Sequence, residues 1–197
     1  MELDSIIDML RQTLAASPTS FEAAANWSAD RMPESWIVAC LMQACQEVGI
    51  AAMPEVRARH DLERFESGGK VITLENVPAL KAGAKIDLFL GEQSSLPGKL
   101  RLRVAMEIKG PKSPWEQFHL DIERLRHFRS VISSKDQAVI FAYVSCPLLE
   151  TEREEDARKL VQHTRMKLSQ FRVSSARQST DGARRARVYM HIIHGTK

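Results

Sequence analysis

The sequence predicts an α/β protein, because segments with helical periodicity and segments with strand periodicity follow one another along the chain. Residues 99–109 alternate apolar and polar side chains, which is the period of a β-strand with one buried face. Residues 138–144 form a continuous apolar run whose length suits a buried strand. Residues 33–48 instead repeat apolar side chains every three or four positions, as an amphipathic helix does.

The N-terminal part of the chain is expected to hold two helices. Residues 3–14 carry apolar side chains at helical spacing, and Ser17-Pro18 is expected to end this helix because a residue before proline disfavours helical angles. Residues 18–32 are interpreted as an irregular connection with a short Ala-rich turn. Pro33 suits the first position of the second helix, and Gly49 is expected to end it.

The rest of the chain is expected to form strands separated by helices. The expected strands cover 53–57, 70–75, 85–90, 99–109, 137–145 and 187–193. Amphipathic helices are expected over 115–125 and 150–170. With 197 residues and 44% hydrophobic content, the chain can bury one core, so we expect a single domain over 1–197.

Cysteine usage and the N-terminus indicate a cytoplasmic protein. The three cysteines, Cys40, Cys45 and Cys146, have no CxxC spacing, so neither disulfides nor a structural zinc site is expected. The six histidines show no ligand pattern. The acidic start does not resemble a signal segment, and the longest apolar stretch is too short to span a membrane.

The net charge of +3 hides a strong asymmetry. Residues 1–157 carry 18 Lys and Arg against 24 Asp and Glu, whereas residues 158–197 carry 10 against one. A basic segment of this kind can neutralise phosphates, so Arg184, Arg185 and Arg187 are predicted to bind nucleic acid. The alternative is that this region is a solvated and mobile surface.

Three side chains on two neighbouring strands form a candidate catalytic and metal site. Asp87 lies in the strand 85–90, and Glu107 and Lys109 share one face at the end of the strand 99–109. Carboxylates suit Mg²⁺, which keeps several of its own waters. A neighbouring ammonium group can orient or help deprotonate an attacking water and offset phosphate charge. As a residue of the exposed face, Lys109 is expected to serve the reaction rather than stability.

The pairing of these strands decides whether the carboxylates meet. A three-residue turn at Leu96-Pro97-Gly98 would pair residues whose numbers sum to 194, which sets Asp87 opposite Glu107. A longer loop with another even sum would keep the common face but lose the direct pairing. The alternative interpretation is a solvated sheet face, but the apolar neighbours of Asp87, the small Ala105 and the unobstructing Gly110 favour a site.

The order of these elements, with Asp87 followed by Glu107-x-Lys109 and a helix, resembles the PD-(D/E)XK nuclease superfamily. The resemblance covers residues 33–145 and implies a restriction-endonuclease-like fold, in which a mixed β-sheet flanked by helices holds divalent ions at one end. It leaves an N-terminal helix and a basic C-terminal helix-strand extension over 146–197 outside. Ile86 stands where the family motif has proline, and the subfamily is not identified.

The resemblance also assigns roles to individual residues. Asp87 is implied as the first metal ligand, Glu107 as the second and Lys109 as the residue beside the attacking water. Glu34 matches an acidic residue early in the first core helix, although a helix dipole also explains a Glu there; Glu47 and Glu55 are weaker substitutes. The helix after Lys109 presents Lys112, Gln117, Asp121 and Arg124. These are expected mostly on its solvated side, with Lys112 or Gln117 as candidates for contact with substrate phosphate.

The resulting expectation is a nuclease dependent on Mg²⁺ or Mn²⁺ that hydrolyses phosphodiester bonds by metal-activated water attack. DNA is the expected substrate rather than RNA, no membrane partner is expected, and a homodimer is left open. The alternative is an inactive module of the same fold that binds nucleic acid or a partner protein.

Overall fold

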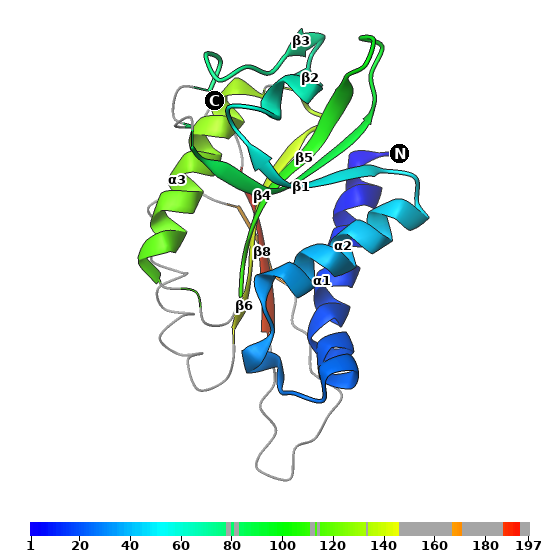
Figure 1. The fold of residues 1–197 in the computed structure, drawn as a ribbon, viewed down its shortest axis with the longest axis vertical. Coiled ribbons are helices and arrows are strands. Elements are labelled where there is room, and N and C mark those ends of the chain that lie inside the picture. Colours follow the sequence, from blue (N-terminus) through cyan, green and yellow to red (C-terminus); the bar gives the residue numbers. More distant parts are fainter. Residues whose placement is uncertain are drawn as a thin grey trace.

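The computed structural model of the chain is a β-sheet with helices on both faces (Figure 1). It describes residues 1–77, 80, 83–110, 113, 115–132, 134–145, 167–170 and 187–193. The elements in chain order are α1 (Leu3–Ala25), η1 (Ala29–Arg31), α2 (Glu34–Glu47), β1 (Ala51–Arg57), η2 (Leu62–Arg64), β2 (Phe65–Ser67), β3 (Lys70–Val71), β4 (Lys85–Gln93), β5 (Leu100–Lys109), α3 (Trp115–Val131), β6 (Ala138–Ser145), β7 (Lys167–Gln170) and β8 (Arg187–Ile193). The predicted α/β class is therefore confirmed.

The sheet is mixed but mostly antiparallel, with the strand order β1-β4-β5-β6-β8-β7. β5 and β6 are parallel, and the other pairs along this path are antiparallel. The short hairpin of β2 and β3 joins the start of β5 through a parallel pairing with β2. β5 is therefore central, and its end is flanked by β4 and β6.

Each face of the sheet is covered by a separate apolar core, which fixes the positions of the helices. Helices α1 and α2 cover one face, where Leu10 and Ile37 pack with Met106 of β5. Helix α3 covers the other face, where Phe118 and Ile122 pack with Ala105. Because burial of each large apolar side chain contributes about 1.5–3 kcal/mol, these two layers hold the helices against the sheet.

Helix α1 does not stop at Ser17-Pro18 as expected but continues to Ala25. Pro18 lacks the N–H that would bond to the carbonyl of Leu14, and the Ser17 hydroxyl donates to that carbonyl at 2.9 Å instead. The helix ends at Asn26, which adopts left-handed angles. The predicted irregular connection over 18–32 is therefore wrong for most of its length.

Helix α2 begins one residue later than predicted and ends, as predicted, before Gly49. Pro33 is its N-cap, Glu34 opens it, and Gly49 follows it with a φ of +73°. Ile37, Leu41 and Cys45 form its buried face. Val48, the last residue of the apolar repeat over 33–48, is 47% exposed because it lies beyond the last helical residue.

Strand β5 differs from the expected pattern because one residue bulges out of it. Leu90 pairs with Val104, whereas Gly91 pairs with Leu102, so Arg103 is an extra residue opposite β4. The bulge reverses the alternation: Leu102 and Ala105, three residues apart, enter the same core. The expectation of a strand with one buried face is therefore wrong, because both faces of β5 are covered.

The C-terminal part shows a second correction. The helix predicted over 150–170 is wrong for its last four residues, because residues 167–170 form β7 and pair with β8. The rest of that predicted helix lies outside the described residues. The strand predicted over 70–75 is reduced to Lys70–Val71. No helix among the described residues has the length and apolar character needed to cross a bilayer.

Candidate active site

The sheet and helices bring four of the predicted side chains together at the end of β5. Asp87 lies on β4, Glu107 and Lys109 on β5, and Glu34 on the first turn of α2. An ion pair links Asp87 to Lys109, and the charges of Asp87 and Glu34 act on Glu107 and Lys109, respectively. We refer to these four residues with Asp121 and Arg124 of α3 as the carboxylate cluster.

Asp87 and Glu107 face each other across β4 and β5. The register pairs Leu88 with Met106, and Asp87 and Glu107 are the next residues along the two strands. Oδ2 of Asp87 accepts a hydrogen bond from the Ile108 amide at 2.7 Å. Burial raises the pKa of Glu107 well above its usual value, and the charge of Asp87 raises it further.

Lys109 is a buried cation held between carboxylates. Its Nζ lies 3.0 Å from Oδ2 of Asp121 and 3.8 Å from Oδ2 of Asp87. Burial alone would lower the pKa of Lys109, but the negative charges of Asp87, Asp121 and Glu34 outweigh it and raise the pKa. The side chain is only 9% exposed. The expectation of an exposed Lys109 is therefore wrong, and the residue is a fixed ammonium group.

Glu34 binds the segment that follows β5 through two hydrogen bonds. Its Oε1 accepts hydrogen bonds from the Gly110 amide at 3.1 Å and from the Ser113 hydroxyl at 2.6 Å. A Cβ atom on Gly110 would lie only 3.3 Å from Cγ of Glu34 and 3.4 Å from the carbonyl oxygen of Met32. Gly110 thus allows the close approach of α2 to the cluster, as its lack of a side chain predicts.

Asp121 and Arg124 complete the cluster, although the sequence placed them on the solvated side of their helix. Their side chains are 10% and 24% exposed. Arg124 Nη2 donates to Oε1 of Glu107 at 2.6 Å and also to Oδ1 of Asp121. Asp121 lies three residues after Phe118 and four before Leu125, so the helical spacing in the sequence places it on the same face as these apolar residues. This spacing could have identified Asp121 as a residue that faces the sheet.

The other predicted residues do not join the cluster in the described part of the chain. Glu55 is exposed and pairs with Lys85 at 3.0 Å, and Glu47 is an exposed residue of α2. Lys112, Arg184 and Arg185 lie outside the described residues. Gln117 lies in α3 and Arg187 in β8, but the structure does not describe their side chains. Their contacts with nucleic acid remain predictions.

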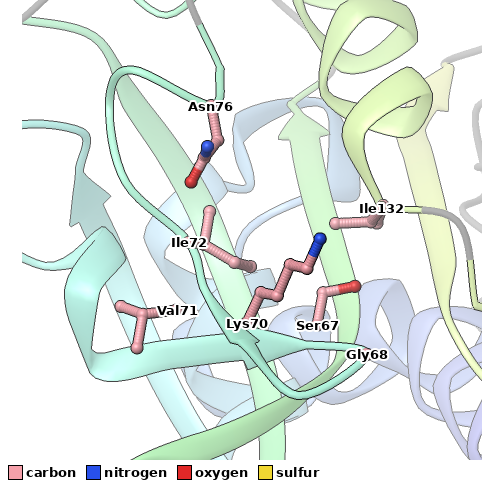
Figure 2. Close-up of a pocket in the computed structure, with 7 residues that line it drawn as sticks. All are labelled: Ser67, Gly68, Lys70, Val71, Ile72, Asn76 and Ile132. Atoms are coloured by element: carbon pink, nitrogen blue, oxygen red, sulfur yellow. The ribbon is translucent and has the colours of Figure 1, made fainter.

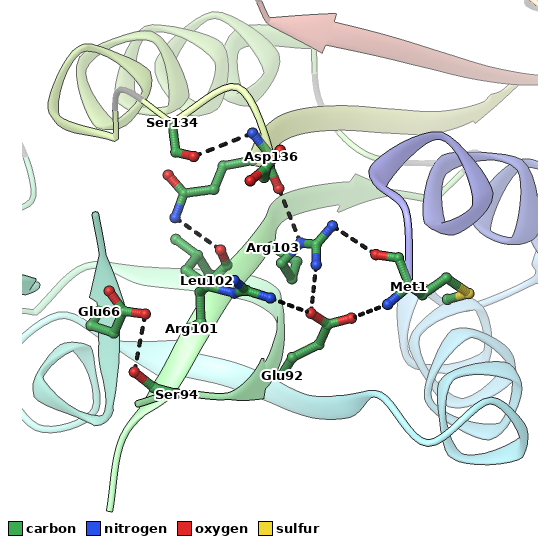
Figure 3. Close-up of polar contacts among 10 residues, drawn as sticks. Met1, Glu66, Glu92, Ser94, Arg101, Leu102, Arg103, Ser134 and Asp136 are labelled. Carbon is green, nitrogen blue, oxygen red and sulfur yellow. Dashed lines mark hydrogen bonds and ion pairs between the residues drawn. The ribbon is translucent and has the colours of Figure 1, made fainter. Parts of the chain in front are cut away.

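Arg103 is the extra residue of β5 whose bulge sets the register of Asp87 and Glu107. Its side chain contacts Glu92, Asp136 and Met1 (Figure 3). Its Nε donates to the Asp136 carbonyl at 3.0 Å, its Nη1 to Oε2 of Glu92 at 2.5 Å, and its Nη2 to the Met1 carbonyl at 2.9 Å. Burial alone would raise the pKa of Glu92, but hydrogen bonds from the N-terminal ammonium, Arg101 and Arg103 lower it to about 2. A guanidinium with three partners thus fixes the extra residue of β5.

The chemistry of the cluster suits a divalent cation. Its four carboxyl groups face two cations, so the fully ionised cluster carries two excess negative charges. No group of three or more His, Cys, Asp or Glu among the described residues is arranged to hold a metal ion by itself. Asp87 and Glu107 supply two oxygen donors, which is enough for Mg²⁺ because it keeps several waters.

A cavity of about 370 Å³ lies at the other end of β5 (Figure 2). Ser67, Lys70 and Asn76 contribute its polar lining, and Ile72 and Ile132 its apolar lining. The adjoining strand β2 pairs with Leu100 and Arg101, whereas the cluster lies at Glu107 and Lys109. The described residues that line the cavity include no carboxylate, and they are separate from the carboxylate cluster.

Comparisons with models of known protein families, with curated protein sequences and with solved structures find no match for this chain. A function is therefore inferred from the chemistry of its side chains.

Proposed function

We propose that the protein is a divalent-metal-dependent nuclease of the PD-(D/E)XK type that hydrolyses phosphodiester bonds, with DNA as the favoured substrate. The observation that carries this proposal is the juxtaposition of Asp87, Glu107 and Lys109. Two carboxyl groups on neighbouring strands lie close enough for the charge of Asp87 to raise the pKa of Glu107, and an ammonium group lies 3.8 Å from Asp87. Two oxygen donors beside a fixed cation match the needs of water attack on a phosphate.

Asp87 and Glu107 are the residues that would hold the ion. Glu107 is held by its bond to Arg124, and Asp87 by its bond from the Ile108 amide, so both carboxyl groups have fixed positions. A bound divalent ion would supply a Lewis acid and lower the pKa of water. Asp87 is 27% exposed and gives the pair access to solvent, whereas Glu107 is buried.

Lys109 would act as a charge stabiliser. Its raised pKa keeps it protonated at neutral pH, so it offers an N–H donor and a positive charge to an oxyanion and does not accept a proton. Asp121 and Asp87 hold the ammonium in place. Preorganised charge of this kind typically contributes a factor of about 10²–10³ to the rate.

The alternative is a binding module without hydrolytic activity. The bond from Arg124 to Glu107 favours it, because a carboxylate already paired with a guanidinium is a weaker ligand for an ion. Ion-dependent cleavage distinguishes the two functions.

The test is cleavage by purified protein of supercoiled, linear and single-stranded DNA and of RNA, each with Mg²⁺, Mn²⁺ or a chelator. We expect cleavage only with a divalent ion and loss of cleavage in Asp87→Asn, which keeps the shape of the side chain. Glu47→Gln is the matched control, because it removes an exposed carboxylate outside the cluster. Cleavage in chelator, or equal rates in Asp87→Asn and the control, would contradict the nuclease proposal. Ion-independent binding without cleavage would support the module.

A further inference from the structure

Arg124 lies where the carboxylate cluster meets solvent, and the roles proposed above leave it without a part in the reaction. Its side chain is 24% exposed, whereas that of its partner Glu107 is 1% exposed. Lys109, the other cation of the cluster, is 9% exposed. Arg124 is thus the cation of the cluster that a bulky substrate can reach most readily.

The guanidinium of Arg124 has hydrogen-bonding capacity to spare. Guanidinium carries five N–H donors in a planar fork, a shape that matches phosphate oxygens. One nitrogen, Nη2, makes the bonds to both Glu107 and Asp121, so the two N–H groups of Nη1 are bonded to neither carboxylate. Nε also has no hydrogen-bond partner in the described part of the chain, but it is buried and closed to a substrate. An oxyanion could therefore bind to Arg124 through Nη1 without displacing Asp121.

When a divalent ion binds, electrostatic repulsion is expected to break the bond from Arg124 to Glu107 rather than its bond to Asp121. Arg124 and a divalent ion would both use the carboxylate of Glu107, and like charges at contact distance repel. Asp121 lies three residues earlier on the same helix and bonds to both Arg124 and Lys109. Arg124 can therefore leave Glu107 while Asp121 keeps it at the edge of the cluster.

We propose that Arg124 is a phosphate-binding residue that exchanges Glu107 for a phosphate oxygen of the substrate when Glu107 takes a divalent ion, with Asp121 as its anchor. This inference rests on the proposed nuclease function and adds the group that binds the phosphate. The exchange makes affinity for nucleic acid depend on the ion, because Arg124 is engaged by Glu107 until the ion is present.

The test measures two kinds of binding, neither of which requires turnover. Titration calorimetry with Mn²⁺ follows the ion site, and fluorescence anisotropy of a labelled DNA duplex follows the substrate, with Ca²⁺ in place of Mg²⁺ or with a chelator. The variants are Arg124→Gln, Arg124→Lys and the control Arg126→Gln, which removes an exposed guanidinium paired with Glu123 on the same helix. All titrations are made at pH 8.5, where protons compete less for Glu107 than at neutral pH, and circular dichroism confirms that each variant is folded.

For wild type and Arg126→Gln we expect Ca²⁺ to strengthen DNA binding. Arg124→Gln should lose about tenfold or more of that gain, yet bind Mn²⁺ at least as tightly as wild type because a repelling charge is gone. Arg124→Lys should lose part of the gain, since it keeps the charge without the fork. If wild type binds no Mn²⁺, the proposed ion site fails and this inference with it. If wild type binds Mn²⁺ but Arg124→Gln keeps the full Ca²⁺-dependent gain, only the role of Arg124 is overturned.

Discussion

Asp87 and Glu107 lie on the same face of the sheet because β5 contains one more residue than β4 requires. Near the turn, Gln93 pairs with Leu100, and continuation of that register would place Met106 opposite Asp87. The bulge at Arg103 advances the pairing by one residue. Without it, Glu107 would point into the core under α2.

Binding of a divalent ion is expected to depend on Asp87 and to strengthen as pH rises. An ion requires ionised carboxylates, and the raised pKa of Glu107 extends the competition by protons for the site to higher pH than for an ordinary glutamate. Calorimetric titration of Mn²⁺ between pH 6 and 8.5 should show tighter binding at higher pH, with proton release. Asp87→Asn should show no binding. Equal binding by wild type and Asp87→Asn would remove Asp87 from the ion site.

Glu107→Gln is expected to stabilise the ion-free protein at neutral pH. A carboxyl group whose folded pKa is raised stabilises the fold below its unfolded pKa, and this contribution is lost as pH rises through the folded pKa. Gln keeps an oxygen that can accept from Arg124 and removes the buried charge. We therefore expect the free energy of unfolding to rise by about 1 kcal/mol at pH 8, and this increase should shrink as pH falls toward 4.5. Urea unfolding in chelator measures it. A variant less stable than wild type at every pH would refute this prediction.

Lys109→Met is expected to lower both stability and cleavage. The exposed position predicted from the sequence implied no loss of stability, but Asp87 and Asp121 would each lose an ammonium partner, which should cost about 1–3 kcal/mol. Cleavage should slow about a hundredfold or more, while ion binding persists because ammonium is not a ligand. Lys85→Met, which breaks an exposed ion pair, is the control and should change stability by less than about 1 kcal/mol.

Glu92→Gln is expected to destabilise the protein at pH 7 but not in acid. The pKa of Glu92 is lowered to about 2 from 4.5, so its stabilisation is present above pH 4.5 and is lost as pH falls toward 2. The partly buried pairs with Arg103 and the N-terminus suggest a cost of about 1–3 kcal/mol. Urea unfolding between pH 7 and pH 3 should show that the difference in unfolding free energy between wild type and Glu92→Gln becomes smaller as pH falls. Glu63→Gln, an exposed carboxylate, should show no such trend.

Local patterns predicted much of the sheet and the candidate site. Glu34 at the start of α2, Asp87 on β4, and Glu107 with Lys109 on β5 lie where sequence periodicity placed them. The direct opposition of Asp87 and Glu107 was predicted for the wrong reason. The Ser94 amide donates to the Lys99 carbonyl, so the loop holds the four residues 95–98 rather than the expected three, and the bulge at Arg103 restores the predicted register. These two departures offset each other.

The remaining errors come from tertiary contacts that no local pattern contains. A proline rule predicted the end of α1, but the Ser17 hydroxyl compensates for the missing bond at Pro18. Asp121 and Arg124 are polar residues on a weakly amphipathic helix, and only their buried partners on β5 draw them toward the sheet. Partners of this kind become visible only when the strands and the helix are placed together.

The six side chains of the carboxylate cluster come from four elements that are far apart along the chain. None of these elements can assemble the cluster alone, because β4 and β5 must pair and both α2 and α3 must dock before the side chains meet. Occupancy by a divalent ion would then favour only the completely folded chain, by mass action. The ion would bind only after the chain has folded completely, so a partly folded chain would have neither the site nor its catalytic activity.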